Sequence, residues 1–264
     1  MNEPSTQGRI RMTMRKNILI TGASSGLGAG MAREFAVRGH NLALCARRID
    51  RLEQLKAELE TANPGIQVAI RTLDVTEHAQ VFEAFQAFRD DLGSLDRVIV
   101  NAGIGQGVPI GKGDFARNRD IIETNFIAAL AQCEAAMEIF RAQSTGHLVI
   151  ISSMSAMRGM HGGLTAYAAS KAGVAALAEG IRADMLRKPG IEVSTIFPGY
   201  IRTEMNQDAP AEHTPFMIDA QRGCYLLAKA IEKEPAKAYV PWWPWAPVGF
   251  LMKRLPLGMV RKLF

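Results

Sequence analysis

The sequence predicts an α/β fold in which a doubly wound, seven-stranded parallel sheet carries helices on both faces. Two observations predict this fold class. Short apolar runs rich in β-branched residues alternate along the chain with longer segments of helical periodicity. Strands that alternate with helices form a parallel sheet, and right-handed crossovers place the helices on both of its faces. The length of 264 residues suits one large domain.

The apolar runs predict the strands, and the periodic segments between them predict the helices. Strands are expected at 16–21, 41–46, 67–73, 95–100, 147–152, 191–196 and 237–240. Helices are expected at 26–38, 50–61, 77–91, 116–141, 166–187 and 220–233. Residues 1–14 are polar and lack the apolar core of a secretory signal, so we expect a flexible N-terminal tail. A single domain should follow at 15–240, and an apolar and basic segment at 241–264.

Composition narrows the classes of function. The chain has 31 Lys and Arg against 26 Asp and Glu, and the net charge of +5 is spread along it, which argues against a nucleic-acid partner. Cys45, Cys133 and Cys224 lie far apart and have no nearby His or Cys of the kind that a metal site needs. We therefore expect free thiols in a reducing compartment, a cytoplasmic protein and no bound metal.

The first predicted strand ends in a glycine-rich turn, TGASSGLGAG. Glycines let a backbone approach a pyrophosphate, whose charge is then met by amide groups at a helix N-terminus. The spacing G-x-x-x-G-x-G differs from both the G-x-G-x-x-G fingerprint and the P-loop. The turn predicts a dinucleotide site in a Rossmann-type domain, and a turn without a ligand is the alternative. Its candidate cofactor-binding residues are Thr21, Gly22, Ser24, Ser25, Gly26, Leu27 and Gly28.

Two arginines, Arg47 and Arg48, follow the second strand. A site for unphosphorylated NAD would carry an acidic residue there to bind the ribose hydroxyls. Asp50 and Glu53 already supply a start signal for the next helix, so helix stability does not require these cations. A guanidinium group fits a 2′-phosphate, and the sequence therefore predicts NADP(H) as the cofactor. Solvated surface arginines are the alternative.

Polar and small residues also end the later strands, where ligands of such sheets bind. Asp74 is equally suited to starting the next helix, and Asn101 with Gly103 equally suited to an ordinary turn. The candidates from these strand ends are Asp74, Val75, Asn101, Ala102, Gly103, Ser153, Pro198, Gly199, Ile201 and Thr203.

Tyr167 and Lys171 are four residues apart within a predicted helix, so their side chains should share one face. A phenol has a pKa of about 10, and a nearby ammonium group favours its charged form. The same spacing is also typical of a solvated helix edge. Ser153 ends the preceding strand fourteen positions before Tyr167, and a loop of that length can bring its hydroxyl back beside the phenol.

Taken together, these residues resemble the short-chain dehydrogenase/reductase superfamily over roughly residues 15–240. The shared motifs, in the family's order, are Thr21-Gly22 with Gly26 and Gly28, Asp74, Asn101-Ala102-Gly103, Asn125, Ser153, Tyr167-x-x-x-Lys171 and Pro198-Gly199. The resemblance implies that Tyr167 is the general acid in reduction and the base in oxidation. Lys171 would lower the pKa of Tyr167 and bind the nicotinamide ribose, and Ser153 would hold the substrate oxygen.

The resemblance gives Asn125 the task of keeping a water in a proton relay, and a buried packing amide is the alternative. The chain departs from the family pattern at two places. Val100 stands where an asparagine is common, and the interval from Ser153 to Tyr167 is one residue longer than usual. Ser152 and Ser155 therefore remain alternatives to Ser153 as the working hydroxyl.

The expected function is an NADPH-dependent oxidoreductase that reduces a carbonyl group, reversibly oxidising an alcohol. One alternative is a catalytically idle NADPH-binding sensor or scaffold, against which the full set of Asn125, Ser153, Tyr167 and Lys171 argues. The other is a nucleotide-sugar epimerase or dehydratase, whose longer chains carry a separate substrate region. The resemblance also implies a homo-dimer or homo-tetramer formed through the helices at 116–141 and 166–187.

The substrate loop should be 202–220, with Phe216, Met217 and Ile218 facing an apolar ligand. The other wall could include His161, Met157 and Met160, although core packing is the favoured role of both methionines.

The final segment, 241–264, contains all three tryptophans and a set of basic residues. Its apolar run is too short and too rich in proline to span a bilayer as a helix. It could lie on a membrane surface, in which case the substrate should be lipophilic. Packing against the substrate cleft or a neighbouring subunit is the slightly favoured alternative. The residues concerned are Trp242, Trp243, Trp245, Lys253, Arg254, Arg261 and Lys262.

Overall fold

The computed structural model describes residues 15–206, 214 and 216–263, so the predicted tail at 1–14 lies outside the described residues. The strands are β1 (Asn17–Thr21), β2 (Asn41–Ala46), β3 (Val68–Thr72), β4 (Arg97–Val100), β5 (Gly146–Ile151), β6 (Ile191–Pro198) and β7 (Lys237–Val240). They form one parallel sheet in the order β3-β2-β1-β4-β5-β6-β7. The predicted fold class is confirmed, and each strand begins and ends within two residues of its expected position.

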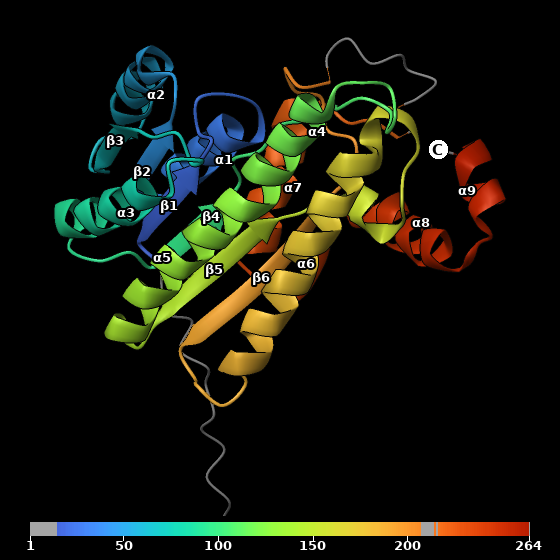
Figure 1. Cartoon of the computed structure of the whole chain (residues 1–264). Coiled ribbons are helices and arrows are strands. Elements are labelled where there is room, and N and C mark those ends of the chain that lie inside the picture. The colour runs from blue at the N-terminus through green and yellow to red at the C-terminus, as the bar shows by residue number, and fades with distance from the viewer. Residues whose placement is uncertain (1–14, 207–213, 215, 264) are drawn as a thin grey trace, which may run out of the picture.

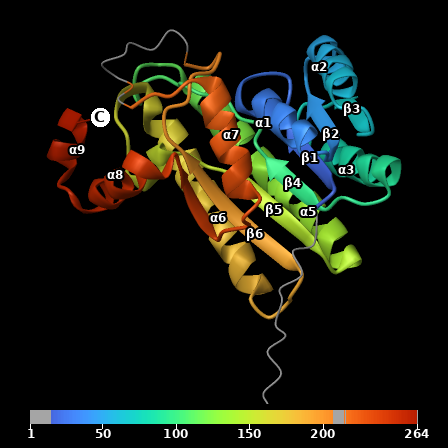
Figure 2. The same cartoon turned by 180° about the vertical axis from the view of Figure 1, so that it is seen from behind.

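Helices cover both faces of the sheet (Figures 1 and 2). They are α1 (Gly26–Val37), α2 (Ile49–Ala62), α3 (His78–Leu92), α4 (Phe115–Ile122), α5 (Ala128–Gln143), α6 (Thr165–Met185), α7 (Ala220–Ile231), α8 (Trp242–Arg254) and α9 (Leu257–Leu263). The single helix expected at 116–141 is interrupted by a π-helical turn, η1 (Glu123–Ile127). Helices α8 and α9 were not predicted.

Two hydrophobic cores lie on the two faces of the sheet. Because successive side chains of a strand point to opposite faces, Leu19 of β1 joins one core while Ile18 and Ile20 join the other. The first core contains the side chains of α3, α5 and α6, and the second contains those of α1, α2 and α7. The strands are therefore buried on both sides, which explains why they read as continuous apolar runs in the sequence.

A buried polar cluster closes the amino edge of the sheet. Glu234 accepts hydrogen bonds from Arg15 at 2.9 Å and from Arg97 at 3.1 Å. Arg97 also donates to Nδ1 of His147 at 2.8 Å, and Nε2 of His147 lies 2.8 Å from the hydroxyl of Ser194. Burial lowers the pKa of His147 well below its usual value, so the ring is a neutral link between these partners.

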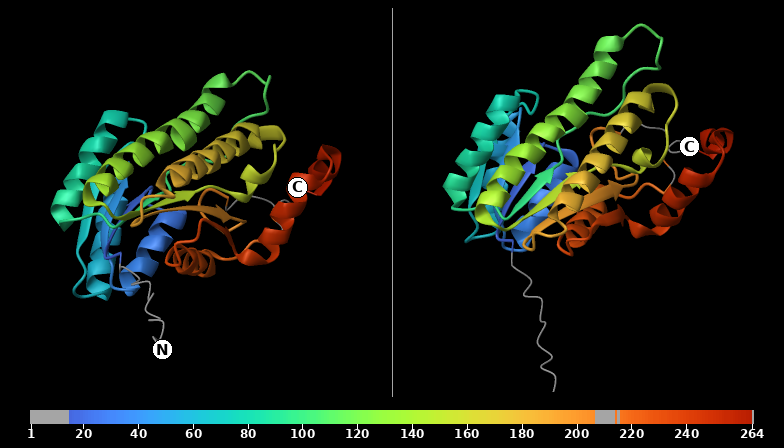
Figure 3. Two further views of the ribbon diagram at one scale, coloured as in Figure 1. Left: turned by 90° about the horizontal axis from the view of Figure 1, so that it is seen from below. Right: turned by 60° about the horizontal axis from the view of Figure 1, so that its bottom comes forward.

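The C-terminal helices lie at the end of the molecule opposite α2 and α3 (Figure 3). Trp245 of α8 is 2% exposed and packs into a third apolar cluster with Met154, Met157 and Phe197. Trp242 and Trp243 are 68% and 70% exposed. Trp245 therefore packs against the protein, as the favoured alternative for this segment expected, while contact of the exposed tryptophans with a membrane stays a prediction. Within the described ranges, no helix is long and apolar enough to cross a membrane.

Candidate active site

The carboxyl ends of β1 and β4 are locked together by the hydroxyl of Thr21. This hydroxyl accepts hydrogen bonds from the backbone amides of Asn101 at 3.0 Å and Ala102 at 3.1 Å. The side-chain amide of Asn101 returns a hydrogen bond to the carbonyl oxygen of Thr21 at 2.8 Å. Asn101 is therefore more than a turn residue, because it fixes the position of the glycine-rich turn.

The glycine-rich turn forms a cradle that side chains would fill. Gly22 has a φ of +66°, and a Cβ atom there would lie 2.9 Å from the Cα atom of Ala102. A Cβ atom on Gly28 would lie 2.3 Å from the carbonyl oxygen of Gly22. Ser25 is the N-cap of α1, but its side chain makes no capping hydrogen bond, which leaves the first amides of the helix for a ligand. This arrangement fits the pyrophosphate of a dinucleotide.

Thr203, from the loop after β6, lies across the turn from the strand ends. A Cβ atom on Gly26 would lie 3.5 Å from the Cβ atom of Thr203. Ile201 is buried and forms an isolated β-bridge with Ile218.

Asp74 accepts hydrogen bonds from the amide and hydroxyl of Thr76, and it does not cap α3. Asp74 therefore stabilises a local turn after β3, and it does not start the next helix, which was the alternative role. Val75, next to it, is buried.

Arg47 and Arg48, the two arginines predicted to bind a phosphate, follow β2 near the glycine-rich turn. Arg48 donates hydrogen bonds to the hydroxyls of Ser24 at 3.1 Å and Ser25 at 2.6 Å. Arg47 is 70% exposed and its guanidinium lies 3.9 Å from the carboxylate of Asp74. Arg48 therefore lies against the cradle with its side chain 43% exposed, and Arg47 lies beside Asp74 and is the more exposed of the two.

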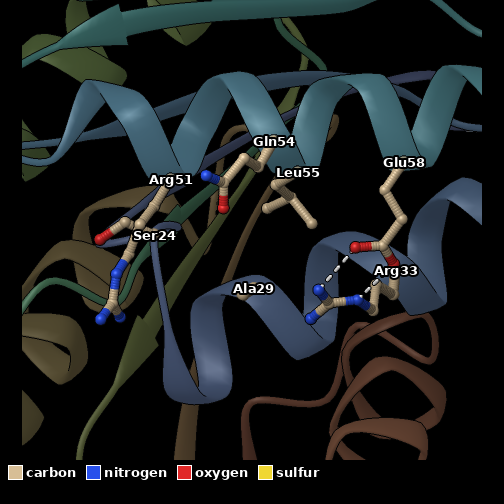
Figure 4. A pocket seen from close by; sticks show the side chains of 7 residues that line it. All are labelled: Ser24, Ala29, Arg33, Arg51, Gln54, Leu55 and Glu58. Carbon is tan, nitrogen blue, oxygen red and sulfur yellow. Dashed lines mark hydrogen bonds and ion pairs between the residues drawn. The ribbon is translucent and has the colours of Figure 1, made fainter.

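A third arginine, Arg51, completes this basic group and was not singled out from the sequence. Its guanidinium lies 2.8 Å from the carboxylate of Glu204, which is 3.6 Å from that of Arg48. Its spacing of three residues from Arg48, the N-cap of α2, is the signal that could have found it. Figure 4 shows the hollow between α1 and α2, with Ser24 and Arg51 at one end and the ion pair of Arg33 with Glu58 at the other.

Tyr167 and Lys171 share one face of α6, as predicted. The ammonium group of Lys171 lies 5.8 Å from the centroid of the Tyr167 ring and donates a hydrogen bond to the carbonyl oxygen of Ile151 at 3.0 Å. Lys171 is buried, and its burial lowers its pKa to about 8. The pair is therefore no solvated helix edge.

The pKa of Tyr167 differs from our expectation. Burial raises it above its ordinary value, although a hydrogen bond with the hydroxyl of Ser153 acts in the opposite direction. Desolvation of the phenol is the largest cause in this structure, and the lowering that we expected from Lys171 stays a prediction. Tyr167 consequently carries its proton at neutral pH, as a proton donor must.

The three candidate serines have different surroundings. Ser152 is buried and its hydroxyl donates to the carbonyl oxygen of Lys171 at 2.7 Å. The backbone amide of Ser155 donates to the hydroxyl of Ser153 at 3.1 Å. Ser153 and Ser155 both line a cavity, and Ser153 is the one whose hydroxyl acts against the rise in the pKa of Tyr167. This geometry favours Ser153.

Asn125 lies in the π-helical turn, a feature that is common at functional sites. Its side chain is buried and exchanges hydrogen bonds of 2.8 and 2.9 Å with the backbone of Ile104. A Cβ atom on Gly103 would lie 3.0 Å from Oδ1 of Asn125 and 3.5 Å from Nζ of Lys171. Asn125 thus fastens the loop after β4 beside Lys171. These contacts match the packing alternative, and the water relay stays a prediction.

A cavity of about 30 Å³ lies beside Ser153. Its lining consists of Ser153, Met154, Ser155, Met160, Pro198, Gly199, Tyr200, Trp245 and Met252. Met160 belongs to the predicted wall, whereas Met157 is buried in the apolar cluster behind it and His161 is exposed. Eight of the nineteen residues of the predicted substrate loop at 202–220, namely 207–213 and 215, lie outside the described residues.

Tyr200 and Trp245 are the large side chains of this cavity. Tyr200 was not singled out from the sequence, whereas Trp245 belongs to the segment for which packing against the substrate cleft was the slightly favoured alternative. Their rings meet edge to face with centroids 5.5 Å apart, and the Trp245 ring also meets Phe216 at 6.2 Å. A Cβ atom on Gly199 would lie 2.1 Å from Nε1 of Trp245, so only glycine admits the indole. That nitrogen is buried and has no hydrogen-bond partner within the described part of the chain.

Comparison with known proteins identifies the class. The family described as short chain dehydrogenase matches residues 16–214. An uncharacterized oxidoreductase of Mycobacterium tuberculosis is 51% identical over 248 residues, covering 94% of this chain and 97% of its own. Among solved structures, levodione reductase superposes with a TM-score of 0.76 at 27% identity over 85% of this chain and 95% of its own. The NADPH-dependent 3-quinuclidinone reductase of Rhodotorula rubra has a TM-score of 0.75 at 25% identity over 90% and 95%.

The chain therefore belongs to the short-chain dehydrogenase/reductase superfamily. It is an oxidoreductase of a family that uses nicotinamide cofactors and acts on small molecules. The cradle at Gly22 and Gly28, with the uncapped start of α1, fits the pyrophosphate of such a cofactor. No group of side chains suited to hold a metal ion occurs among the residues that the structure describes.

Proposed function

We propose that the protein is an NADPH-dependent reductase that converts the carbonyl group of a lipophilic small molecule to an alcohol, and catalyses the reverse oxidation. The observation that carries the proposal is the meeting of Ser153, Tyr167 and Lys171 beside the glycine-rich cradle, at the carboxyl edge of the sheet. The alternatives, an idle sensor or scaffold and a nucleotide-sugar epimerase or dehydratase, have no corresponding observation in their favour.

The bound cofactor supplies the hydride. The protein must then stabilise the oxygen that gains charge and deliver one proton to it. The hydroxyl of Ser153 holds that oxygen, and Tyr167 donates the proton. Lys171 offers an ammonium group to the phenolate that remains, and Asn125 holds the neighbouring loop in place. In oxidation the same groups act in the opposite direction.

The proposal of NADPH over NADH rests on charge. The guanidinium of Arg48 donates hydrogen bonds to the hydroxyls of Ser24 and Ser25, and the neighbouring residue Arg47 is exposed. A 2′-phosphate offers both guanidinium groups a charged acceptor. The similar 3-quinuclidinone reductase is NADPH-dependent by name, which agrees with this assignment.

The lipophilic substrate is proposed from the cavity wall. Met154, Met160, Trp245 and Met252 give it an apolar and adaptable surface. The buried N–H group of Trp245 favours a substrate with a second hydrogen-bond acceptor, because an unpaired buried donor is costly.

Two wider properties belong to the same proposal. We propose a homo-dimer or homo-tetramer formed through α4, α5 and α6, and a cytoplasmic location. The cysteines at 45, 133 and 224 are free and buried, as suits a reducing compartment. Sedimentation equilibrium of the purified chain tests the oligomer.

The decisive experiment measures NADPH oxidation against a panel of aromatic and aliphatic ketones, aldehydes and quinones. Tyr167→Phe should lower kcat/KM by about 10²–10⁴-fold, the usual contribution of a general acid. Ser153→Ala should cost about 10²–10³-fold, whereas the matched variant Ser152→Ala should keep most of the activity, because the Ser152 hydroxyl is bonded to the helix backbone. Full turnover by Tyr167→Phe would falsify the mechanism.

A further inference from the structure

The two C-terminal helices, α8 and α9, form a C-terminal arm (residues 242–263) with an unusual concentration of exposed apolar surface. Fifteen large apolar side chains are exposed in the described part of the chain, and six of them belong to this arm. These six are Trp242, Trp243, Phe250, Leu251, Leu257 and Met259, with exposures between 49% and 70%. Such a concentration marks a surface that meets another apolar phase or partner.

The arm is also purely cationic. Glu234 is the last acidic residue of the sequence, and five basic residues follow it. Four of them lie on the arm and are exposed, namely Lys253, Arg254, Arg261 and Lys262. The guanidinium of Arg254 lies 3.7 Å from the centroid of the Phe250 ring, so cationic and apolar groups share one surface. Aromatic residues beside lysine and arginine are the composition that favours the headgroup region of a bilayer.

The opposite face of α8 is fixed to the protein. Trp245 and Met252 are each 2% exposed, and a Cβ atom on Gly249 would lie 2.9 Å from the Met154 side chain. Arg158 donates a hydrogen bond to the carbonyl oxygen of Lys253 at 3.2 Å. The described contacts therefore hold α8 in one orientation with its apolar and basic face outward.

The backbone before Pro244 explains why two tryptophans point outward while the third points inward. Trp243 has φ and ψ of −99° and 131°, outside the helical region, as is typical of a residue before proline. The regular part of α8 begins after it, and Trp245 then falls on the inner face with Met252, seven residues later.

We propose that the outer face of the C-terminal arm docks on the surface of an anionic lipid bilayer. The charge of the arm selects this occupant over a second copy of the chain, because a symmetric contact between two such arms would bring cations against cations with no carboxylate of the arm to offset them. Anionic headgroups supply the missing negative charge, and the exposed tryptophans enter the headgroup boundary.

Docking in this orientation would place the cavity beside Ser153 one helix away from the lipid, because Trp245 and Met252 line that cavity from the inner face of α8. This consequence for substrate supply rests on the proposed function. The docking itself does not, and it is measured below without substrate or cofactor.

The first test is sedimentation of the full-length protein with vesicles of phosphatidylcholine alone or with 30 mol% phosphatidylserine. We expect binding to the phosphatidylserine vesicles, weakened by added salt. At about 1 kcal/mol per cation near such a surface, neutralising four should weaken binding by about 10²–10³-fold. The variant is Lys253→Gln, Arg254→Gln, Arg261→Gln and Lys262→Gln combined. Its control carries Lys112→Gln, Arg141→Gln, Arg187→Gln and Lys188→Gln, four exposed cations outside the arm.

The apolar half of the proposal needs its own pair of variants. Trp242→Ser with Trp243→Ser should weaken vesicle binding by at least about tenfold. Val37→Ser with Leu186→Ser, at 75% and 79% exposure, should leave it unchanged. Failure of the wild-type protein to bind phosphatidylserine vesicles, or equal binding by all four variants, overturns the proposal. A change of oligomeric mass in the arm variants without a change in vesicle binding also overturns it, in favour of a second copy.

The second test uses the fact that all three tryptophans of the chain lie in the arm, so intrinsic fluorescence reports on it without labels. Brominated phosphatidylcholine should quench the two outer tryptophans in Trp245→Phe, and should hardly affect the single buried tryptophan in Trp242→Phe with Trp243→Phe. Equal quenching in both proteins overturns the orientation. Tyr167→Phe, with an intact arm, should bind vesicles like the wild type, so failure of the catalytic proposal would be seen separately.

Discussion

Both the amino edge and the carboxyl edge of the sheet bury cationic side chains, but within the described ranges only those at the amino edge are paired with a carboxylate. At the amino edge Arg15 and Arg97 meet the carboxylate of Glu234, and the neutral ring of His147 joins them. At the carboxyl edge Lys171 is equally buried, but among the described residues its only hydrogen-bond partner is a backbone carbonyl, and its pKa falls to about 8. A paired buried charge stabilises one packing, whereas an unpaired one beside a cavity is suited to stabilise charge that develops there.

The largest effect should come from removing the unpaired cation. Lys171→Met should lower reductive kcat/KM by about 10²–10³-fold, because charge on the tyrosine oxygen would no longer be stabilised. The free energy of unfolding should stay the same or rise, since burying a thioether is cheaper than burying an ammonium group. Steady-state kinetics and urea denaturation check the two parts, and a clear loss of stability would contradict the comparison.

Removing the partner at the amino edge should give the reverse pattern. Glu234→Ala leaves two buried guanidinium groups without their carboxylate and should lower the free energy of unfolding by about 3 kcal/mol. Catalytic parameters at a temperature where the variant is folded should change less than about twofold, because the cluster lies at the other end of the strands. Glu232→Ala is the matched control. Glu232 lies 3.4 Å from Arg38 and 3.6 Å from His40 at the partly exposed rim of the same edge, and these contacts should contribute less than about 1 kcal/mol.

The carboxyl edge also carries exposed cations, and these should act on cofactor choice. Arg47→Ala with Arg48→Ala should raise KM for NADPH by about 10–100-fold, the loss of a charge-assisted contact of about 1.5–3 kcal/mol. KM for NADH should hardly change, and the single variants should give intermediate values. Arg89→Ala, remote from the cradle, serves as the control. If the ratio of the KM values for NADPH and NADH is unaltered in the double variant, Arg47 and Arg48 do not bind the 2′-phosphate.

The smallest effect is a pH dependence that only the unpaired cation should produce. With a pKa of about 8, Lys171 loses its charge above that pH, so reductive kcat/KM should be level below about pH 8 and fall about tenfold per unit above it. Tyr167 keeps its proton over this range because its own pKa is raised. The folded-state pKa of Lys171 lies below the unfolded value of about 10.4, so its contribution to the free energy of unfolding should rise between these pH values. Lys171→Met should lose both dependences.

The sequence alone determined the fold class, the strand positions and the family, because each depends on local signals. A buried parallel strand is a short apolar run, and a backbone that must approach a phosphate or another strand needs glycine, as Gly22 and Gly28 show. The position of Tyr167 and Lys171 on one face of the same helix also follows from helical spacing.

Only the tertiary structure decided which side chains from distant elements meet. Helical periodicity predicted one helix at 116–141, and the π-helical turn that brings Asn125 to Ile104 has no periodic signature. Ser152 and Ser153 are neighbours in sequence, yet one is bonded to α6 and the other faces Tyr167.

The inward turn of Trp245 was equally out of reach of sequence patterns, because it depends on the backbone at Trp243 and on the space that Gly199 leaves. The raised pKa of Tyr167 follows from the burial that packing creates. Sequence patterns report how each element is buried, whereas contacts and desolvation between elements arise only when the chain is packed.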